Sequence, residues 1–166
     1  HAEMEVSVSY ADGVISVQTK QTQSTGDNVP AVFEVPLVLD IGEKRGVRRV
    51  VLQVTQKSET FTVPCTDRPR FVVVDPEMRI LGDVSVKAPA DMLRAQAKGA
   101  PTARGRWLAV DALSSHDDTL TIECLSGRLA DEKEFWGVRC NAAEALGRIR
   151  NKTCETALLK HAGTKH

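Results

Sequence analysis

Histidines are the first residues to examine for metal chemistry, because a zinc peptidase needs two of them one helical turn apart with a glutamate between them. The sequence has four histidines and contains no HExxH motif. His1 and His166 stand at the two ends of the chain, while His116 and His161 fall near the ends of expected helices. A histidine in the last turn complements the helix dipole. We therefore predict that this chain has no metal site of its own.

Residues 114–118 (SSHDD) contain serine, histidine and aspartate, the residue types of a hydrolase triad. A triad is assembled from distant chain positions, and neighbours in a short loop cannot generally adopt its geometry. The GxSxG, phosphate-loop and GxGxxG motifs are also absent. We interpret the run as a link between two helices, with Asp117 or Asp118 as the N-cap, and predict no catalytic or cofactor-binding residue.

The cysteines are widely spaced and form no CxxC pair, which gives no support for a zinc knuckle or a thioredoxin-like redox site. They are Cys65, Cys124, Cys140 and Cys154. A reduced, buried thiol is favoured over a disulfide or a reactive nucleophile for the last three, which lie in helical patterns. A reducing, cytoplasmic setting follows as an expectation.

Trp107 and Trp136 are the only tryptophans, and Phe135 directly precedes the second of them. Aromatic residues on a surface can anchor a binding partner. An aromatic residue at the start of a helix more often packs into the preceding helix pair, and that core role is the one we expect here.

The charge balance argues against nucleic acid and membrane partners. Lys and Arg together number 22, as do Asp and Glu, so the chain lacks the basic footprint of such binders. The cluster of Lys44, Arg45, Arg48 and Arg49 contains no aromatic residue and is expected to be a solvated turn and strand start. The sequence has no run of about 18 apolar residues, so we expect no membrane span.

The elements that position these residues fall into two classes along the chain. Alternation with a period of two, rich in Val, Ile, Thr and Phe, predicts strands in the first half. The predicted strands cover residues 4–10, 14–20, 32–41, 48–56, 60–65, 71–74 and 80–86. Residues 22–30 are read as a surface loop, residues 42–46 as a charged loop, and Pro36 as a sign of an edge strand or bulge. About seven such strands predict an antiparallel β-sandwich.

From about residue 87 the period changes to nearly four and the composition becomes helical, which predicts about five helices. A shift of 33 residues aligns several pairs of positions. They are Arg106 with Arg139, Ala109 with Ala142, Asp111 with Glu144, Ala112 with Ala145, Leu113 with Leu146 and Leu125 with Leu158. A period of this size is typical of stacked helix pairs, although two copies can also arise by chance in an alanine-rich segment. The predicted fold class is thus α+β, with the sandwich at residues 3–87 and a partial α-solenoid of HEAT-like helix pairs at residues 88–163.

Several stretches resemble the C-terminal half of the gluzincin zinc aminopeptidases, of the membrane alanyl aminopeptidase type. They are residues 17–23 (VQTKQTQ), 33–39, 71–76 (FVVVDP), 135–139 (FWGVR) and 142–147 (AAEALG), the last two resembling the HEAT-type repeats of bacterial members. The resemblance covers most of the chain. The zinc motif and the GxMEN loop of the family have no counterpart here, so no catalytic residue is carried over.

The resemblance implies a non-catalytic segment that links a catalytic domain to a C-terminal helical domain. It implies zinc only in the catalytic domain of the parent protein, and no cofactor in this chain. The expected partners are that missing catalytic domain and further helical repeats; a dimer through the last helical face would be non-physiological. The alternative is a protein-interaction or assembly module of a non-enzymatic relative. A free-standing secreted adhesion-type sandwich is disfavoured by the helical half and the cysteines.

Overall fold

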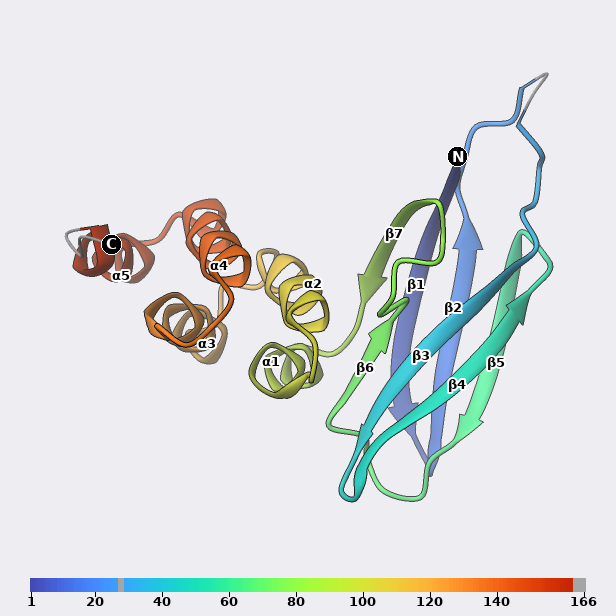
Figure 1. Cartoon of the computed structure of the whole chain (residues 1–166), viewed down its shortest axis with the longest axis horizontal. Helices are drawn as coiled ribbons and strands as arrows, with labels where there is room; N and C mark the ends of the chain where they lie inside the picture. The colour runs from blue at the N-terminus through green and yellow to red at the C-terminus, as the bar shows by residue number, and fades with distance from the viewer. Residues whose placement is uncertain (27–28, 163–166) are drawn as a thin grey trace. The chain divides into compact units, whose positions relative to one another are not determined.

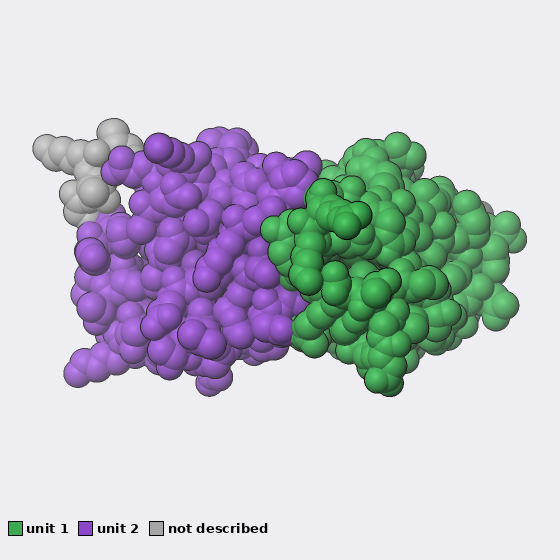
Figure 2. All heavy atoms as spheres, turned by 90° about the horizontal axis from the view of Figure 1, so that it is seen from below, with its two compact units in different colours: residues 1–89 green, residues 90–166 purple. Residues whose placement is uncertain are grey.

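The computed structural model describes residues 1–26 and 29–162, which contain seven strands and five helices in an α+β arrangement (Figure 1). The chain divides into two compact units, His1–Pro89 and a second unit that begins at Ala90 (Figure 2). The first unit holds all the described strands and the second all the described helices. Each unit is considered by itself below.

The strands of the first unit form two sheets. A four-stranded sheet has the order β5-β2-β1-β7, and a three-stranded sheet has the order β4-β3-β6. The strand bounds are β1 Ala2–Ala11, β2 Val14–Gln21, β3 Val35–Glu43, β4 Gly46–Val54, β5 Ser58–Pro64, β6 Phe71–Val74 and β7 Gly82–Lys87. In β1 and β2 every second side chain is buried, as the alternating pattern predicted, and Val6, Ile15 and Val17 are fully buried.

One sheet is not purely antiparallel, which corrects the expectation from sequence. Strand β1 pairs with β2 in antiparallel register but with β7 in parallel register, from Ala2 opposite Gly82 to Ser7 opposite Lys87. Parallel neighbours need a long crossover connection, and here the five intervening strands provide it. Periodicity describes each strand singly and does not reveal which distant strands pair.

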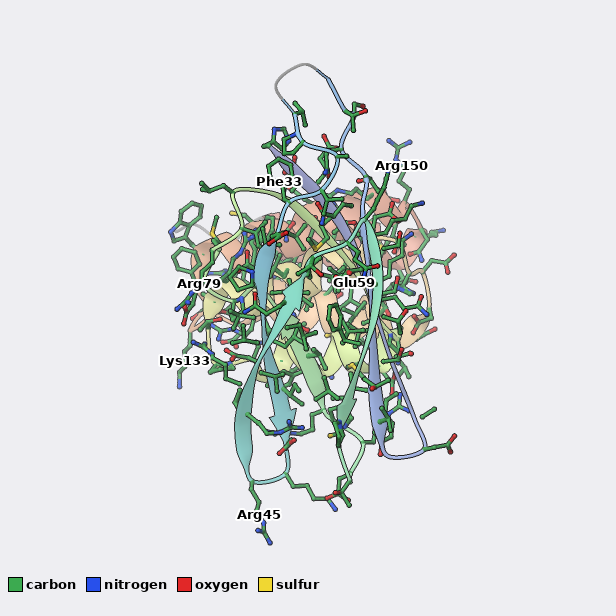
Figure 3. All side chains as sticks on the ribbon, turned by 90° about the vertical axis from the view of Figure 1, so that its right-hand side faces the viewer. Phe33, Arg45, Glu59, Arg79, Lys133 and Arg150 are labelled. Carbon is green, nitrogen blue, oxygen red and sulfur yellow. The ribbon has the colours of Figure 1, made fainter. Side chains whose placement is uncertain are left out.

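The loop predicted at residues 42–46 is shorter than expected. Gly42 and Glu43 belong to β3 and Gly46 to β4, so only Lys44 and Arg45 form the turn, and Arg45 extends from its tip (Figure 3). Gly42 is paired within β3, and the Phe71 ring packs on it; a Cβ atom there would come within 2.6 Å of that ring. This glycine therefore serves strand packing rather than a turn.

Pro36 stands in β3, opposite Gln53 of β4. Strand β3 is central in its sheet, but β6 pairs only with residues 39–42, so Pro36 lies beyond that pairing. Its position has the local character of an edge, which agrees with the missing N–H donor of proline.

The segment before β3 is fastened by a glutamine side chain. Gln21 is fully buried and its Oε1 accepts from the Phe33 N–H at 2.8 Å, while its Nε2 donates to the Phe33 carbonyl at 2.9 Å (Figure 3 labels Phe33). This pair of bonds satisfies the polar atoms of the buried Gln21 side chain and fixes the backbone at Phe33. The predicted loop at residues 22–30 lies in this segment, and its residues 27 and 28 fall outside the described part of the chain.

The helices of the second unit pack in succession. Their bounds are α1 Ala90–Gly99, α2 Ala103–Leu113, α3 Thr119–Ala130, α4 Trp136–Ile149 and α5 Lys152–Ala162. Helix α1 packs against α2 and α3, and α4 packs against α2, α3 and α5. The starts of α2 and α4 are 33 positions apart, as are the starts of α3 and α5.

Two arginines related by the same 33-residue shift make similar bonds. Arg106 Nη1 donates to the carbonyl of Ala100, which directly follows α1, at 2.8 Å. Arg139 Nε donates to the carbonyl of Leu129, near the end of α3, at 3.1 Å. Each arginine thus satisfies a carbonyl that the end of the preceding helix leaves without a partner. The match between these positions in the sequence therefore has a structural role.

Candidate functional site

The serine- and histidine-containing run at residues 114–118 connects α2 and α3, as predicted. Ser115 Oγ donates to the carbonyl of Ala112 at 3.0 Å, so this hydroxyl closes the end of α2. Asp118 is the N-cap of α3, and its carboxylate accepts from the N–H of Thr121 at 3.1 Å. The hydrogen bond from the Thr121 hydroxyl lowers the pKa of the Asp118 carboxyl, which favours the ionised form that caps the helix.

Among residues 1–26 and 29–162, no group of three or more His, Cys, Asp or Glu side chains is arranged to hold a metal ion. His116 lies in the link after α2, and His161 lies in the last turn of α5. His166 falls outside the described residues.

The cysteines differ in exposure. Cys65, Cys124 and Cys154 are buried, whereas Cys140 on α4 is exposed, and all four are free thiols. Burial raises the pKa of the Cys65 and Cys124 thiols, which keeps them protonated. The expectation of a buried thiol was therefore wrong for Cys140.

Lys44, Arg48 and Arg49 of the basic cluster near the β3–β4 turn are paired with acidic side chains. Lys44 lies 3.4 Å from Asp67, and Arg48 Nε donates to Glu43 at 2.7 Å. Arg49 forms a two-pronged pair with Asp40, with bonds of 2.8 and 2.9 Å. These pairs hold the strands and the turn together.

A buried carboxylate that sequence reasoning did not find joins three segments of the helical unit. The side chain of Glu134 is 2% exposed and takes two bonds from Arg106, at 2.7 and 2.8 Å. Arg128 Nη1 adds a third bond at 3.2 Å. The bond from Arg106 lowers the pKa of the Glu134 carboxyl, so the group stays ionised. The cluster holds the α3–α4 link onto α2, and the sequence separation of 28 between Glu134 and Arg106 hid it.

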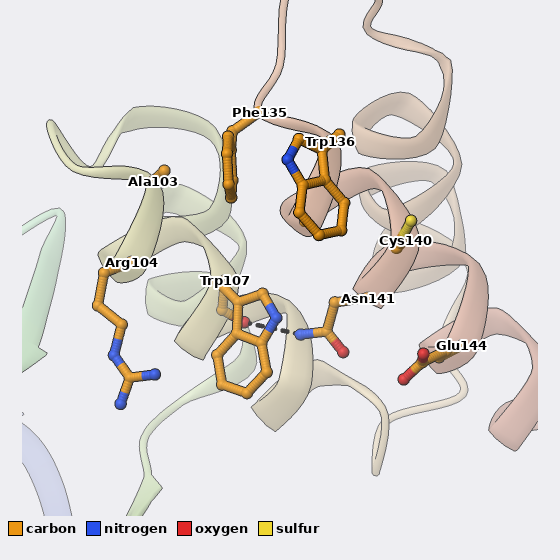
Figure 4. Close-up of a pocket in the computed structure, with 9 residues that line it drawn as sticks. Ala103, Arg104, Trp107, Phe135, Trp136, Cys140, Asn141 and Glu144 are labelled. Atoms are coloured by element: carbon orange, nitrogen blue, oxygen red, sulfur yellow. Dashed lines mark hydrogen bonds between the residues drawn. The ribbon is translucent and has the colours of Figure 1, made fainter. Parts of the chain in front are cut away.

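The residues best suited to recognition line a groove between α2 and α4, which we call the aromatic groove (Figure 4). Its volume is about 500 Å³. It is lined by Ala103, Arg104, Trp107, Phe135, Trp136, Gly137, Cys140, Asn141 and Glu144. Asn141 is 3% exposed and donates from Nδ2 to the carbonyl of Trp107 at 3.1 Å, which fastens α4 to α2 beside the groove.

Two rings stand at the start of α4. The centroids of Phe135 and Trp136 are 5.4 Å apart with their planes tilted by 48°. Gly137 makes room for this arrangement, because a Cβ atom at that position would lie 2.7 Å from the Phe135 ring. On the α2 side, the Arg104 guanidinium lies 5.3 Å from the centre of the Trp107 ring. The groove thus combines flat apolar faces with one cation.

These aromatic residues do not fill the core in the way expected. Phe135 is 49% exposed and Trp136 is 70% exposed, while Trp107 is half-buried. The prediction that Phe135 and Trp136 pack into the preceding helices was therefore wrong. A possible signal was the Phe-Trp-Gly sequence, since glycine after two aromatic residues at a helix start leaves room for a ring on the surface. Chemically, the arrangement suits binding of an apolar group with polar neighbours.

Within the described part of the chain, no helix has the length and apolar character needed to cross a membrane.

No protein-family model matches the sequence, and no curated protein sequence matches it either. A comparison with solved structures finds the crystal structure of Legionella pneumophila aminopeptidase A in complex with aspartic acid, with a TM-score of 0.59 and 12% identity. The match covers 95% of this chain and 21% of that aminopeptidase, so the chain spans about a fifth of its length. At this identity the likeness concerns the fold: these residues adopt a fold found in part of an aminopeptidase.

Proposed function

We propose that this chain is a non-catalytic structural segment of a zinc-dependent aminopeptidase. In this proposal residues 3–87 form a β-sandwich bridge and residues 88–163 a HEAT-like helical segment, of which residue 163 lies outside the described part. The observation that carries the proposal is the fold likeness to an aminopeptidase over 95% of the chain. The catalytic zinc would belong to the catalytic domain of the parent protein.

Engagement of the buried acidic groups supports a structural role. Asp40 is 7% exposed and bonded to Arg49, and Glu134 is bonded to Arg106. Carboxylates bonded in this way to arginine side chains stabilise the connection of elements and are not placed to activate a water molecule. The proposal therefore assigns no catalytic, cofactor-binding or metal-binding residue to the chain.

The HEAT-like assignment is supported by the equal spacing of the helix starts and by the matching bonds of Arg106 and Arg139. In such an array each pair stacks on the next. The described end of the array leaves an apolar groove of about 550 Å³ that includes Leu146, Leu158 and Leu159, the last of them 68% exposed. Further repeats of the parent protein would cover this surface, and a dimer formed through it would be non-physiological.

The free thiols support a reducing, cytoplasmic location, since disulfides are rare in that compartment.

The test compares this chain with the full-length parent protein. Zinc content is measured by elemental analysis, and turnover is measured on a panel of amino-acid anilides. We expect stoichiometric zinc and turnover in the full-length protein, and neither in residues 1–166. Turnover by residues 1–166 alone would overturn the proposal.

A second candidate is a protein-interaction module of a non-enzymatic relative. The exposed Phe135 and Trp136 favour it, because aromatic residues on a surface often anchor partners. If the full-length protein contains no zinc and does not hydrolyse the amino-acid anilides, this candidate would be supported over the first.

A further inference from the structure

The turn that joins β1 to β2 (Figure 1) consists of two residues, Asp12 and Gly13, between the paired residues Ala11 and Val14. Asp12 has a φ of +50° and Gly13 a φ of +78°. A two-residue hairpin loop with positive φ at both positions is a type I′ turn, and Asp-Gly is one of its preferred sequences. The Asp12 side chain is exposed at this turn.

The peptide group between Asp12 and Gly13 makes no hydrogen bond within residues 1–26 and 29–162. Neither the Asp12 carbonyl nor the Gly13 N–H has a partner there, and the Asp12 carboxylate is not paired with any of those residues. The next carbonyl along the chain is held, because Gly13 O accepts from the Cys65 N–H at 2.8 Å. The Asp12–Gly13 peptide plane can therefore rotate without breaking a bond to a strand.

We infer that Asp12 is a site of spontaneous isomerisation to isoaspartate through a succinimide. This inference does not depend on the proposed function. The Gly13 nitrogen bonds to Asp12 Cγ, and its proton leaves with the hydroxyl of the protonated carboxyl group as water. Water then opens the ring: attack at Cγ restores aspartate, whereas attack at the backbone carbonyl leaves the chain running through Cβ and Cγ. The net change is an isomerisation that needs no other reagent.

Ring closure fixes one torsion angle of Asp12, and the hairpin can accept that angle. In the ring the Gly13 nitrogen eclipses the Asp12 Cβ, which for an L residue sets ψ at about −120°, the value at the first central position of a type II′ turn. That position also has positive φ, as Asp12 already has, and type II′ turns also join antiparallel strands through two residues. Gly13 can change the sign of its φ because it has no Cβ. The ring therefore fits the turn while Ala11 and Val14 stay paired.

Asp83 offers an internal comparison. Asp12 is the only aspartate in the sequence that precedes a glycine. Asp83 is also exposed, but it lies in β7 opposite Glu3 and precedes the β-branched Val84. Rotation of the peptide that follows Asp83 would disturb the pairing of β7 with β1, and the Val84 side chain crowds the attacking nitrogen. We therefore expect Asp83 to be far less reactive.

Isomerisation changes the place where the turn meets the end of β5. An isoaspartyl residue adds its Cβ to the backbone, so the loop no longer matches a two-residue turn. The bond from the Cys65 N–H to Gly13 O depends on that loop, and Tyr10 Oη donates to the Cys65 carbonyl at 3.2 Å beside it. We expect faster hydrogen exchange of the Cys65 amide in the isoaspartyl product.

The rate of ring closure is measured with Asp12→Asn, which keeps a preferred type I′ sequence and releases ammonia in place of water. Mass spectrometry follows the exchange of NH2 for OH in the folded chain and in an unfolded peptide of residues 8–17 with the same substitution. We expect the folded chain to react no more than about a hundredfold more slowly than the peptide, because the hairpin adds only local strain. A reaction that required global unfolding would be slower by at least about a thousandfold. The control Asp12→Gln, which would need a six-membered ring, should release no ammonia over the same time.

The wild-type chain is incubated at neutral pH, and isoaspartate is located by electron-transfer fragmentation in the mass spectrometer. We expect at least about tenfold more isoaspartate at Asp12 than at Asp83. Equal amounts at the two positions would overturn the inference. It would also be overturned if Asp12→Asn reacted more than about a hundredfold more slowly in the folded chain than in the peptide, because the hairpin would then prevent ring closure. Unchanged exchange of the Cys65 amide in the product would contradict the expected effect on the end of β5.

Discussion

Substitution of Glu134 by glutamine is the sharpest test of how the helical unit is held together. The change keeps the shape of the side chain but removes the charge that faces Arg106 and Arg128. Breaking a buried ion pair by removing one partner typically costs 3–5 kcal/mol. The Arg106 and Arg128 side chains are 19% and 18% exposed, so water can solvate them in part. We therefore expect Glu134→Gln to lower the free energy of unfolding by about 3 kcal/mol.

The assay is urea unfolding followed by tryptophan fluorescence, which reports on the helical unit because Trp107 and Trp136 are the only tryptophans. The free energy of unfolding is compared between the wild type, Glu134→Gln and the control Glu132→Gln, which changes an exposed neighbour in the same link. The control should change it by less than about 0.5 kcal/mol. A loss below about 1 kcal/mol for Glu134→Gln would refute the argument, since an exposed salt bridge contributes that much.

The effect of Glu134→Gln on the free energy of unfolding should depend on pH. The pKa of the Glu134 carboxyl is lowered in the folded state, chiefly by the bond from Arg106. Its contribution to stability is therefore fully present above the unfolded pKa of about 4.3 and is lost as pH falls through the lower folded value. The difference between the wild type and Glu134→Gln should shrink below about pH 4, and a difference that stays constant there would contradict the assignment.

Three further predictions concern single positions. Gln21→Ala should cost about 2 kcal/mol and speed hydrogen exchange of the Phe33 amide, because that part-buried donor loses its acceptor, whereas the exposed Gln18→Ala should do neither. Gly82→Ala should lower the free energy of unfolding by about 2 kcal/mol and reduce exchange protection in β1, since a Cβ atom there would lie 2.0 Å from a β1 carbonyl. Gly127→Ala, exposed within α3 with open space around it, should instead raise the melting temperature, with a gain of about 0.5–1 kcal/mol.

Local patterns predicted the elements well, because each reflects interactions between residues close in the sequence. Alternation located the first two strands, a high content of Val, Ile, Thr and Phe between turn signals located the other five, and a polar residue before an apolar periodic run located the N-cap Asp118. Prediction from the sequence failed where a residue packs against a partner far away along the chain. Gly42 was read as a loop residue because nothing in its neighbourhood reveals that the Phe71 ring packs on it.

The candidate site was harder to predict for the same reason. The Trp107, Phe135 and Trp136 side chains were identified in the sequence, but their exposure depends on which helices lie beside them. The partnership of Glu134 with Arg106 joins positions 28 residues apart and had no signal in composition or spacing. Residue types in the sequence identified the candidate residues, whereas their burial and their partners could be determined only from the structure.

The 33-residue shift also separates packing from recognition within the helical unit. Where the two copies agree, as at Arg106 and Arg139, the side chain bonds to the end of the preceding helix. At two positions of the aromatic groove they differ: Ala103 corresponds to Trp136, and Arg104 to Gly137. Residues that hold a helix pair together are needed in every copy, whereas residues that bind one partner are needed in one copy. The Trp136 ring and the Gly137 that makes room beside it therefore have no counterpart at the positions that the shift relates to them.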